Sequence, residues 1–386
     1  MQGRLLLQPL TTLDDMRFLA FSDLHLDAPF AQGGSDLANL RRAELGRTLE
    51  RTIGLAKEME VDALLCAGDL YEHNHVTPDT VRLLERVFQE MAPIPVLISP
   101  GNHDWYGPKS PYRTATWSGN VHIFPSGEMT SWDDPGECFR VWGFAHQKPS
   151  GTPNPLERFR VDGESVHLGL FHGSEISGWS RALQLDERKH QHAPFAAEHI
   201  EAAGLTHCVV GHYHQPVEGE RYTYGGAPAA LSFGAPGNRD AVELVFDEIG
   251  ELDKREWHKT CELEVSDLEL DITKCGDMRE IEKKLDSLLA LRSGIARVTL
   301  VGDLSPTVRF DLQRLEARRG PLEHLSVRVG NLQTGYDLKQ IRSEPSVRGE
   351  FVRGVEADEE LRPETRQRVI VTGLRALEGR DDLEVA

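Results

Sequence analysis

The sequence predicts an α/β protein whose first part contains parallel strands joined by helices. Three short apolar segments of strand length alternate with two longer segments that have the apolar spacing of amphipathic helices. The strands are expected at 17–22, 63–66 and 95–99, and the helices at 37–60 and 77–91. This β-α-β-α-β order implies parallel strands connected by right-handed crossovers.

The individual elements rest on simple patterns. The segment 17–22 is compact and apolar and ends at a polar turn. In the segment 37–60, Leu45, Leu49 and Ile53 recur at helical spacing among charged residues, which is typical of a surface helix. Further elements are expected as strands at 121–124, 139–144, 166–171 and 206–210, a helix at 193–203, and a run of strands at 222–257 that completes a second sheet.

The texture of the chain changes near residue 260. Fifteen of the 16 histidines lie at or before His258, so any histidine-based chemistry belongs to the first part. Beyond it, alternating helix and strand patterns predict a smaller α/β domain, and the last 40 residues are highly charged. The expected division is a tail at 1–16, a main domain at 17–260, a smaller domain at 261–345, and a C-terminal tail at 346–386 with a helix carrying Val369, Ile370, Leu374 and Leu377 on one side.

Composition restricts the class of protein. The net charge of -19 argues against a nucleic-acid binder whose affinity comes from a basic surface, so a polyanionic substrate would need bound metal ions or a partner protein to attract it. Five scattered cysteines without a C-x-x-C pair indicate reduced thiols and a cytoplasmic location. No run of 18 apolar residues is present, so no membrane span is expected.

Polar motifs follow the strands one after another. They are D-x-H at Asp23 and His25, G-D at Asp69, G-N-H-D at 101–104, His172 after a strand, and G-H-x-H with His212 and His214. Each motif alone has an ordinary reading as a turn, a helix cap or a core histidine. The chain even contains a second Gly-Asp-Leu at 302–304 without companion histidines, which we interpret as a turn. The ordered set at strand ends, where ligands bind in open α/β sheets, is what indicates function.

The residue types predict a site for two metal ions. Two divalent ions about 3.5–4 Å apart need a carboxylate bridge, which Asp69 can provide. The other ligands are expected to divide into Asp23, His25 and His214 for one ion and Asn102, His172 and His212 for the other. A mixed nitrogen and oxygen set without thiolate suits Mn, Fe or Zn. A hydroxide held between such ions is a nucleophile at neutral pH.

One histidine is left over from the ligand set. His103 is the candidate catalytic residue that stabilises the transition state and protonates the leaving oxygen, and Asp104 is a candidate to orient it.

The motif series resembles that of the calcineurin-like metallophosphoesterase superfamily over residues 17–215. Within it, the wording at 68–71 and 94–104 is similar to the SbcD-type DNA-repair exonucleases, and the stretch from Ser110 to Pro125 resembles their YhaO branch. In many of these enzymes His or Asp stands three residues after the bridging Asp and faces DNA; here that residue is Glu72, followed by His73 and His75, which we interpret as solvated loop residues.

The resemblance implies a four-layer α/β/β/α core with a smaller α/β capping domain that contacts DNA. It also implies two Mn ions, double-strand break repair by exonuclease and endonuclease action, a homodimer, and an SbcC-type coiled-coil ATPase as partner. Two alternatives remain open from the sequence. One is a small-molecule phosphatase or phosphodiesterase, and the other is a scaffold that binds DNA and its ATPase without cutting.

Overall fold

The computed structural model describes residues 15–31, 34–163, 165–177, 192–235, 240–305, 308, 311–334 and 336–379. The chain divides into two compact units, with the boundary between Leu263 and Glu264. Most of the tail expected at 1–16 lies outside the described residues, and Met16 already belongs to the first strand. No described helix combines the length and the apolar character that crossing a bilayer requires.

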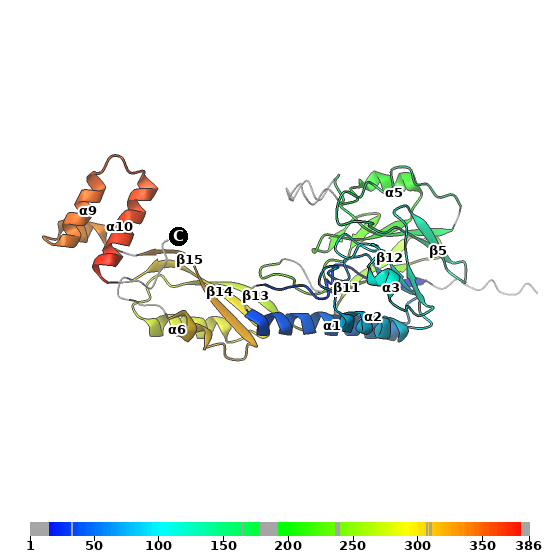
Figure 1. Ribbon diagram of the computed structural model, residues 1–386, viewed down its shortest axis with the longest axis horizontal. Helices are drawn as coiled ribbons and strands as arrows, with labels where there is room; N and C mark the ends of the chain where they lie inside the picture. The colour runs from blue at the N-terminus through cyan, green and yellow to red at the C-terminus, as the bar shows by residue number, and fades with distance from the viewer. Residues whose placement is uncertain are drawn as a thin grey trace, which may run out of the picture. The chain divides into compact units, whose positions relative to one another are not determined.

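The first unit contains two six-stranded sheets (Figure 1). In the first sheet four strands run parallel and two antiparallel strands complete one side. In sheet order they are β12 (Leu252–Lys259), β11 (Asp240–Phe246), β1 (Met16–Phe21), β2 (Ala63–Cys66), β3 (Val96–Ile98) and β4 (Val121–Ile123). The parallel β1-α1-β2-α2-β3 order that the sequence predicted is therefore confirmed.

The second sheet is also mixed. Its order is β5 (Thr130–Asp133), β6 (Phe139–Gly143), β7 (Val166–His172), β8 (His207–Gly211), β10 (Tyr222–Tyr224) and β9 (Val217–Glu218). The expectation that all strands of 222–257 join this sheet is wrong, because β11 pairs with β1 and β12 pairs with β11 in the first sheet. An apolar strand pattern shows that a strand is buried, but it does not identify the neighbouring strand.

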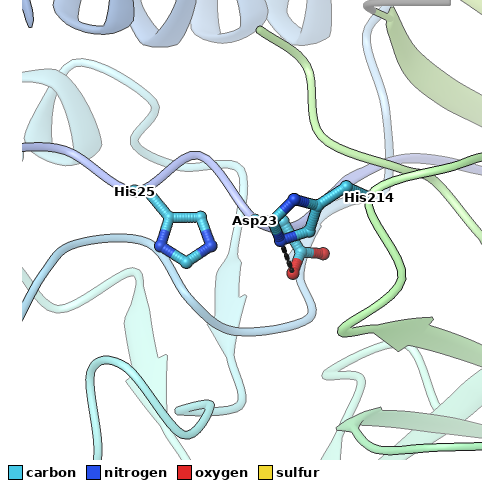
Figure 2. A group of neighbouring side chains, drawn as sticks. All are labelled: Asp23, His25 and His214. Carbon is cyan, nitrogen blue, oxygen red and sulfur yellow. Dashed lines mark ion pairs between the residues drawn. The ribbon is translucent and has the colours of Figure 1, made fainter. Parts of the chain in front are cut away.

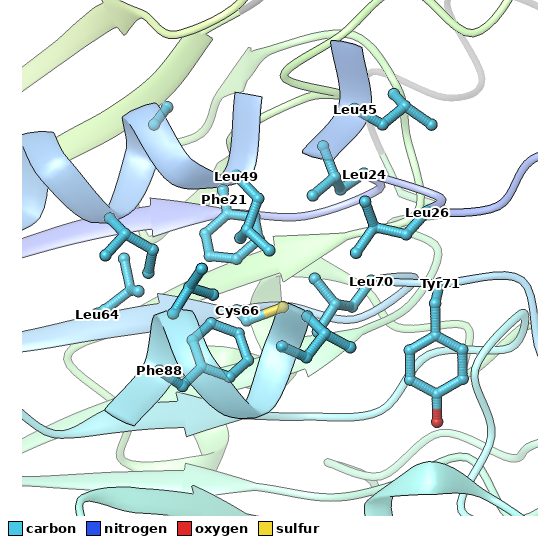
Figure 3. Packing of buried hydrophobic residues seen from close by; sticks show 14 of the residues in the cluster. Phe21, Leu24, Leu26, Leu45, Leu49, Leu64, Cys66, Leu70, Tyr71 and Phe88 are labelled. Carbon is cyan, nitrogen blue, oxygen red and sulfur yellow. The ribbon is translucent and has the colours of Figure 1, made fainter. Parts of the chain in front are cut away.

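Helices cover the outer faces of the two sheets. On the first sheet, α1 (Gly34–Glu58) and α2 (Pro78–Gln89) pack side chains such as Leu49 and Phe88 against Phe21, Leu64 and Cys66 (Figure 3). On the second sheet, α5 (Ala197–Ala203) packs its apolar side against residues of β7 and β8. The short helix α3 (Pro111–Thr114) follows β3.

A separate apolar core lies between the two sheets. It includes Phe18 and Leu65 from the first sheet and Val141, Leu168 and Val209 from the second, all buried. Since successive strand residues point to opposite faces, each sheet supplies one face to this core and the other to its helices. The predicted four-layer α/β/β/α architecture is confirmed.

The second unit starts with a three-stranded parallel sheet. Its elements are β13 (Val265–Asp271), α6 (Met278–Leu289), β14 (Ile295–Leu304), α7 (Leu312–Glu316) and β15 (His324–Thr334). The Gly-Asp-Leu copy at 302–304 lies within β14 and is not the expected turn. The register shifts between Leu300 and Gly302, whose φ is +98°, so this glycine allows an irregular ladder to continue.

The C-terminal segment is more ordered than a charged tail. It forms α8 (Leu338–Ser343), α9 (Val347–Ala357) and α10 (Pro363–Leu377). Their small apolar core contains Ile341, Val352, Ile370 and Leu374. The stripe predicted on the last helix is therefore divided: Ile370 and Leu374 are buried, whereas Leu377 remains 48% exposed.

Candidate metal centre

Five strands of the first unit end at one site. Each carries its polar motif just at or after its last residue, and the motifs come from both sheets. Asp23 and His25 follow β1, Asp69 follows β2, Asn102 and His103 follow β3, His172 ends β7, and His212 and His214 follow β8. All these strands are parallel within their sheets, so their carboxyl ends meet at the same edge.

Four of the predicted ligands have an unusual backbone. The φ angles of Asp23, His25 and Asp69 are +54°, +51° and +52°, and that of His212 is +107°. Positive φ is costly for a residue with a Cβ and persists only where the surrounding structure enforces it. The chain holds these side chains against local backbone preference, which is typical of functional sites.

The glycines of the motifs let the strand ends approach each other. Gly68 precedes Asp69 and has a φ of +87°. A Cβ on Gly68 would lie 2.7 Å from the Gly101 nitrogen and 2.9 Å from Nδ1 of His172. The loops after β2 and β3 therefore pack too closely for any other residue at this position.

The side chains predicted for one ion lie together. Asp23, His25 and His214 each offer a ligand atom, and these three atoms lie within 4.8 Å of one another (Figure 2). Nε2 of His214 is 3.6 Å from Oδ1 of Asp23. The rings of His25 and His214 are 5.2 Å apart between centroids.

The second group centres on Asp69. Its Oδ2 atom lies 3.2 Å from Nε2 of His172 and 3.7 Å from Nε2 of His25, so this carboxylate stands between the two halves. Asp23, Asp69 and His172 also form a possible ligand group. The ring of His212 is 5.2 Å from that of His172. His212 therefore stands beside His172 and His214 beside His25, the division that the sequence suggested.

The donor atoms fit a divalent ion. Among the described residues, Nε2 of His25, Nε2 of His172 and Oδ1 of Asn102 are buried and make no hydrogen bond. Leaving such atoms unpaired is costly unless a ligand satisfies them. The opposite ring nitrogens are held: Nδ1 of His172 lies 2.9 Å from the Ala67 carbonyl oxygen, and Nδ1 of His25 lies 2.8 Å from Glu72. This arrangement leaves Nε2 free for a metal.

The site concentrates opposite charges. Burial would by itself raise the pKa of Asp69, but His172, His25 and His103 hold it well below its usual range. Burial lowers the pKa of His172, and the neighbouring Asp69 outweighs this effect and raises it to about 9. Without a metal, the imidazoles therefore take protons and pair with the carboxylates, and metal binding would displace those protons.

Glu72 is the functional residue that the sequence analysis missed. Its Oε2 atom accepts a hydrogen bond from Nδ1 of His103 at 3.0 Å, and its Oε1 atom accepts one from Nδ1 of His25 at 2.8 Å. Burial would raise the pKa of Glu72, but the two histidines lower it to about 2. Its position three residues after Asp69 was the available signal. Of its neighbours, His73 stacks on Trp105 and His75 is exposed.

Asp104 has a structural role instead of the expected contact with His103. Its buried carboxylate accepts hydrogen bonds from the backbone nitrogens of Gly101 and Leu70 at 2.6 and 2.7 Å, and from the Tyr112 hydroxyl at 2.6 Å. It thus ties the loop after β2 to the loop after β3. Burial and the Asp69 carboxylate raise the pKa of Asp104 to about 6.

The layered fold and this set of carboxylate, amide and imidazole ligands define a metal-dependent phosphoesterase as the class of protein. The chain belongs to the calcineurin-like phosphoesterase family, whose sequence model matches residues 16–246. It is 27% identical over 216 residues to the "Uncharacterized metallophosphoesterase YhaO" of Bacillus subtilis (strain 168). That alignment covers 53% of this chain, and the chain spans about half the length of that relative.

Solved structures of similar fold include the protein TT1561 of Thermus thermophilus. It aligns with a TM-score of 0.39 and 14% identity over 64% of this chain and 100% of that one. The purple acid phosphatase PPD1 of yellow lupin (Lupinus luteus) aligns with a TM-score of 0.37 and 13% identity over 64% of this chain and 52% of that one. These alignments add nothing to the family assignment.

Proposed function

We propose that the protein is a metal-dependent phosphodiesterase that acts on DNA as a nuclease. The observation that carries the hydrolytic part is the buried, unpaired set of donor atoms on His25, His172 and Asn102 around the Asp69 carboxylate. Two divalent ions held by the predicted ligands would polarise a phosphoryl group and lower the pKa of a water molecule. We infer Mn as the metal from the SbcD-type resemblance.

The protein's own residues define the rest of the chemistry. The His103 side chain is 46% exposed, so substrate can reach it, and Glu72 holds its Nδ1 atom. The Nε2 atom is then the one available to donate a proton to the leaving oxygen. Burial lowers the pKa of His103, but Glu72 and Asp69 outweigh this and raise it to about 9, so the ring is protonated at neutral pH.

DNA is proposed as the substrate on two grounds. The motif wording around Asp69 and Asn102 resembles the SbcD-type nucleases, and the chain carries a second compact α/β unit that hydrolysis of a small ester does not require. The net charge of -19 favours the alternative, a small-molecule phosphodiesterase, because no basic surface is needed to hold a small substrate.

An SbcC-type coiled-coil ATPase is the proposed partner that supplies DNA affinity. A groove of about 480 Å³ on the C-terminal helices is lined by Phe351 and Val369 with threonines and Arg368 around them. A hydrophobic groove of this kind suits an amphipathic helix. A recombinant coiled-coil fragment of an SbcC-type ATPase is expected to bind the wild type and not Val369→Glu, with Leu291→Glu as a control at a 98% exposed position. Equal binding by all three would remove the groove from the proposal.

The substrate is tested with Mn²⁺, linear duplex DNA and a small aryl phosphodiester, using wild type and His103→Ala. Degradation of DNA by the wild type and not by the variant is expected. Turnover of the aryl ester alone would replace the nuclease by the small-molecule enzyme, and metal binding without any turnover would indicate a non-cutting scaffold. His75→Ala, at an exposed histidine of the same loop region, is the matched control and should keep full activity on the aryl ester.

A further inference from the structure

His192 lies beside the candidate metal centre although no motif includes it. Its ring is 5.1 Å from the ring of His212 and tilted by 45° to it. The backbone holds this position from two sides, because the His192 carbonyl oxygen accepts a hydrogen bond from the Ser174 nitrogen at 2.9 Å and His192 forms a parallel bridge with Thr152. The ring is therefore placed by the fold next to a predicted ligand.

One ring nitrogen of His192 has nothing to bind. Nδ1 is buried and makes no hydrogen bond within the described residues. Other histidines with a buried unpaired nitrogen pack against aromatic side chains, as His73 does on Trp105 and His122 on Phe124. His192 instead faces a metal-ligand histidine, so its unpaired nitrogen has a chemical environment that can supply a partner.

The two sides of the site are alike in this respect. His103 stands 4.7 Å from His25 between ring centroids, and His192 stands 5.1 Å from His212. Each predicted half of the centre thus has one accessory histidine. Burial first, and then the positive charge of His172, lower the pKa of His192, while Asp69 acts in the opposite direction. These contributions show that His192 senses the same charged groups as the ligands.

A ligand role for His192 is disfavoured by distance. Among the described residues, no group of three or more acidic, cysteine or histidine side chains with ligand atoms within 4.8 Å of one another includes it. A side chain that stands outside the ligand cluster but next to it can contact what the metals bind. In a phosphoesterase this is a phosphoryl oxygen.

We propose that His192 is a phosphate-contacting residue whose imidazole hydrogen-bonds a non-bridging oxygen of the substrate phosphoryl group on the His172 and His212 side of the site. This inference rests on the proposed phosphoester hydrolysis at the same site. It gives the phosphoryl group a contact on each half: His103 toward the leaving oxygen and His192 toward a non-bridging oxygen.

The test measures binding of methylphosphonate, a phosphoryl dianion without an ester bond, to the Mn²⁺-loaded full chain by calorimetry. His192→Phe keeps the ring size and removes both nitrogens, and it should raise the dissociation constant about tenfold, as expected for one hydrogen bond to a charged group. His192→Gln keeps a donor and should restore part of the affinity. Mn²⁺ affinity should stay within about twofold of wild type for both variants.

Several outcomes would overturn the proposal. Methylphosphonate affinity equal to wild type in His192→Phe would show that the ring does not contact phosphate, and a wild type that does not bind methylphosphonate would do the same. A large loss of Mn²⁺ affinity would make His192 a ligand. A packing role would reverse the order, with Phe tolerated and Gln not. His75→Phe is the matched control at an exposed histidine. Because binding is measured without turnover, a protein that binds methylphosphonate but hydrolyses no ester refutes the proposed function alone.

Discussion

Glu72 holds His103 through a hydrogen bond of 3.0 Å to Nδ1 and uses its other oxygen to hold Nδ1 of His25 at 2.8 Å. One carboxylate thus orients both a predicted metal ligand and the candidate general acid. The side chain is only 19% exposed, so water does not compete freely for it. A carboxylate that binds two imidazoles in this way fixes both rings and favours their protonated or metal-bound forms.

Replacing Glu72 by Gln should change the pH dependence of turnover. The pKa of His103 is raised to about 9, so its proton is present below that pH and is lost as the pH rises through it. Gln removes the charge that raises this pKa, so the alkaline limb should move toward the ordinary histidine value of about 6.5. We expect an activity loss of about tenfold or more at pH 8. Rates of aryl phosphodiester hydrolysis from pH 6 to 10 measure it, and an unmoved limb contradicts the role of Glu72.

Asp69→Asn should abolish stabilisation by metal. A ligand that binds only the folded state stabilises it by about 2.7 kcal/mol at one hundred times its dissociation constant. The wild type should therefore melt at higher temperature in Mn²⁺ than in a chelator, whereas the variant should not, because Asp69 stands between both groups of ligands. Asp303→Asn, in the Gly-Asp-Leu copy of the second unit, is the matched control and should keep the full increment. An equal increment in Asp69→Asn would refute the bridge.

Asp104→Ala should destabilise the fold without metal. The substitution leaves the nitrogens of Gly101 and Leu70 and the Tyr112 hydroxyl without their acceptor in a buried place. Loss of one partner in such a network costs about 3–5 kcal/mol. Urea unfolding in chelator measures the free energy. Tyr112→Phe removes one of these bonds and should cost about 1 kcal/mol. A loss below that of Tyr112→Phe would show that Asp104 does not tie the two loops.

His207 should make the protein less stable in mild acid. Burial, aided by Arg255 and Arg221, lowers the pKa of His207 to about 3, and its Nε2 atom lies 2.9 Å from the Thr223 hydroxyl. The unfolded chain takes up a proton near pH 6.5 while the folded state does not, so stability is complete above pH 6.5 and falls as the pH drops toward 3. The loss reaches about 2 kcal/mol at pH 5.

Urea unfolding at pH 7 and pH 5 separates this contribution from those of other groups. In His207→Gln the difference between the two pH values should be smaller by that amount, whereas in His75→Gln it should equal that of the wild type, because His75 is exposed. The same pH difference in all three proteins would show that His207 titrates normally.

The sequence by itself determined the α/β layers and the order of the motifs. Apolar strands and amphipathic helices alternate with a clear period, and the polar residues stand directly after strands such as β1, β2 and β8. Parallel strands bring their carboxyl ends to one edge, so residues as far apart in the chain as Asp23 and His214 could be placed together in advance.

Only the tertiary structure decided which side chains support this site. Glu72 and Asp104 are both acidic residues close to motif histidines, and nothing in their spacing shows that Glu72 points at His103 while Asp104 points at the backbone of the neighbouring loop. His192 lies 20 residues before His212 without any motif, and β11 follows β10 in the chain but joins the other sheet. These features depend on side-chain direction and on contacts between distant segments, whereas sequence periodicity records only which face of an element is buried.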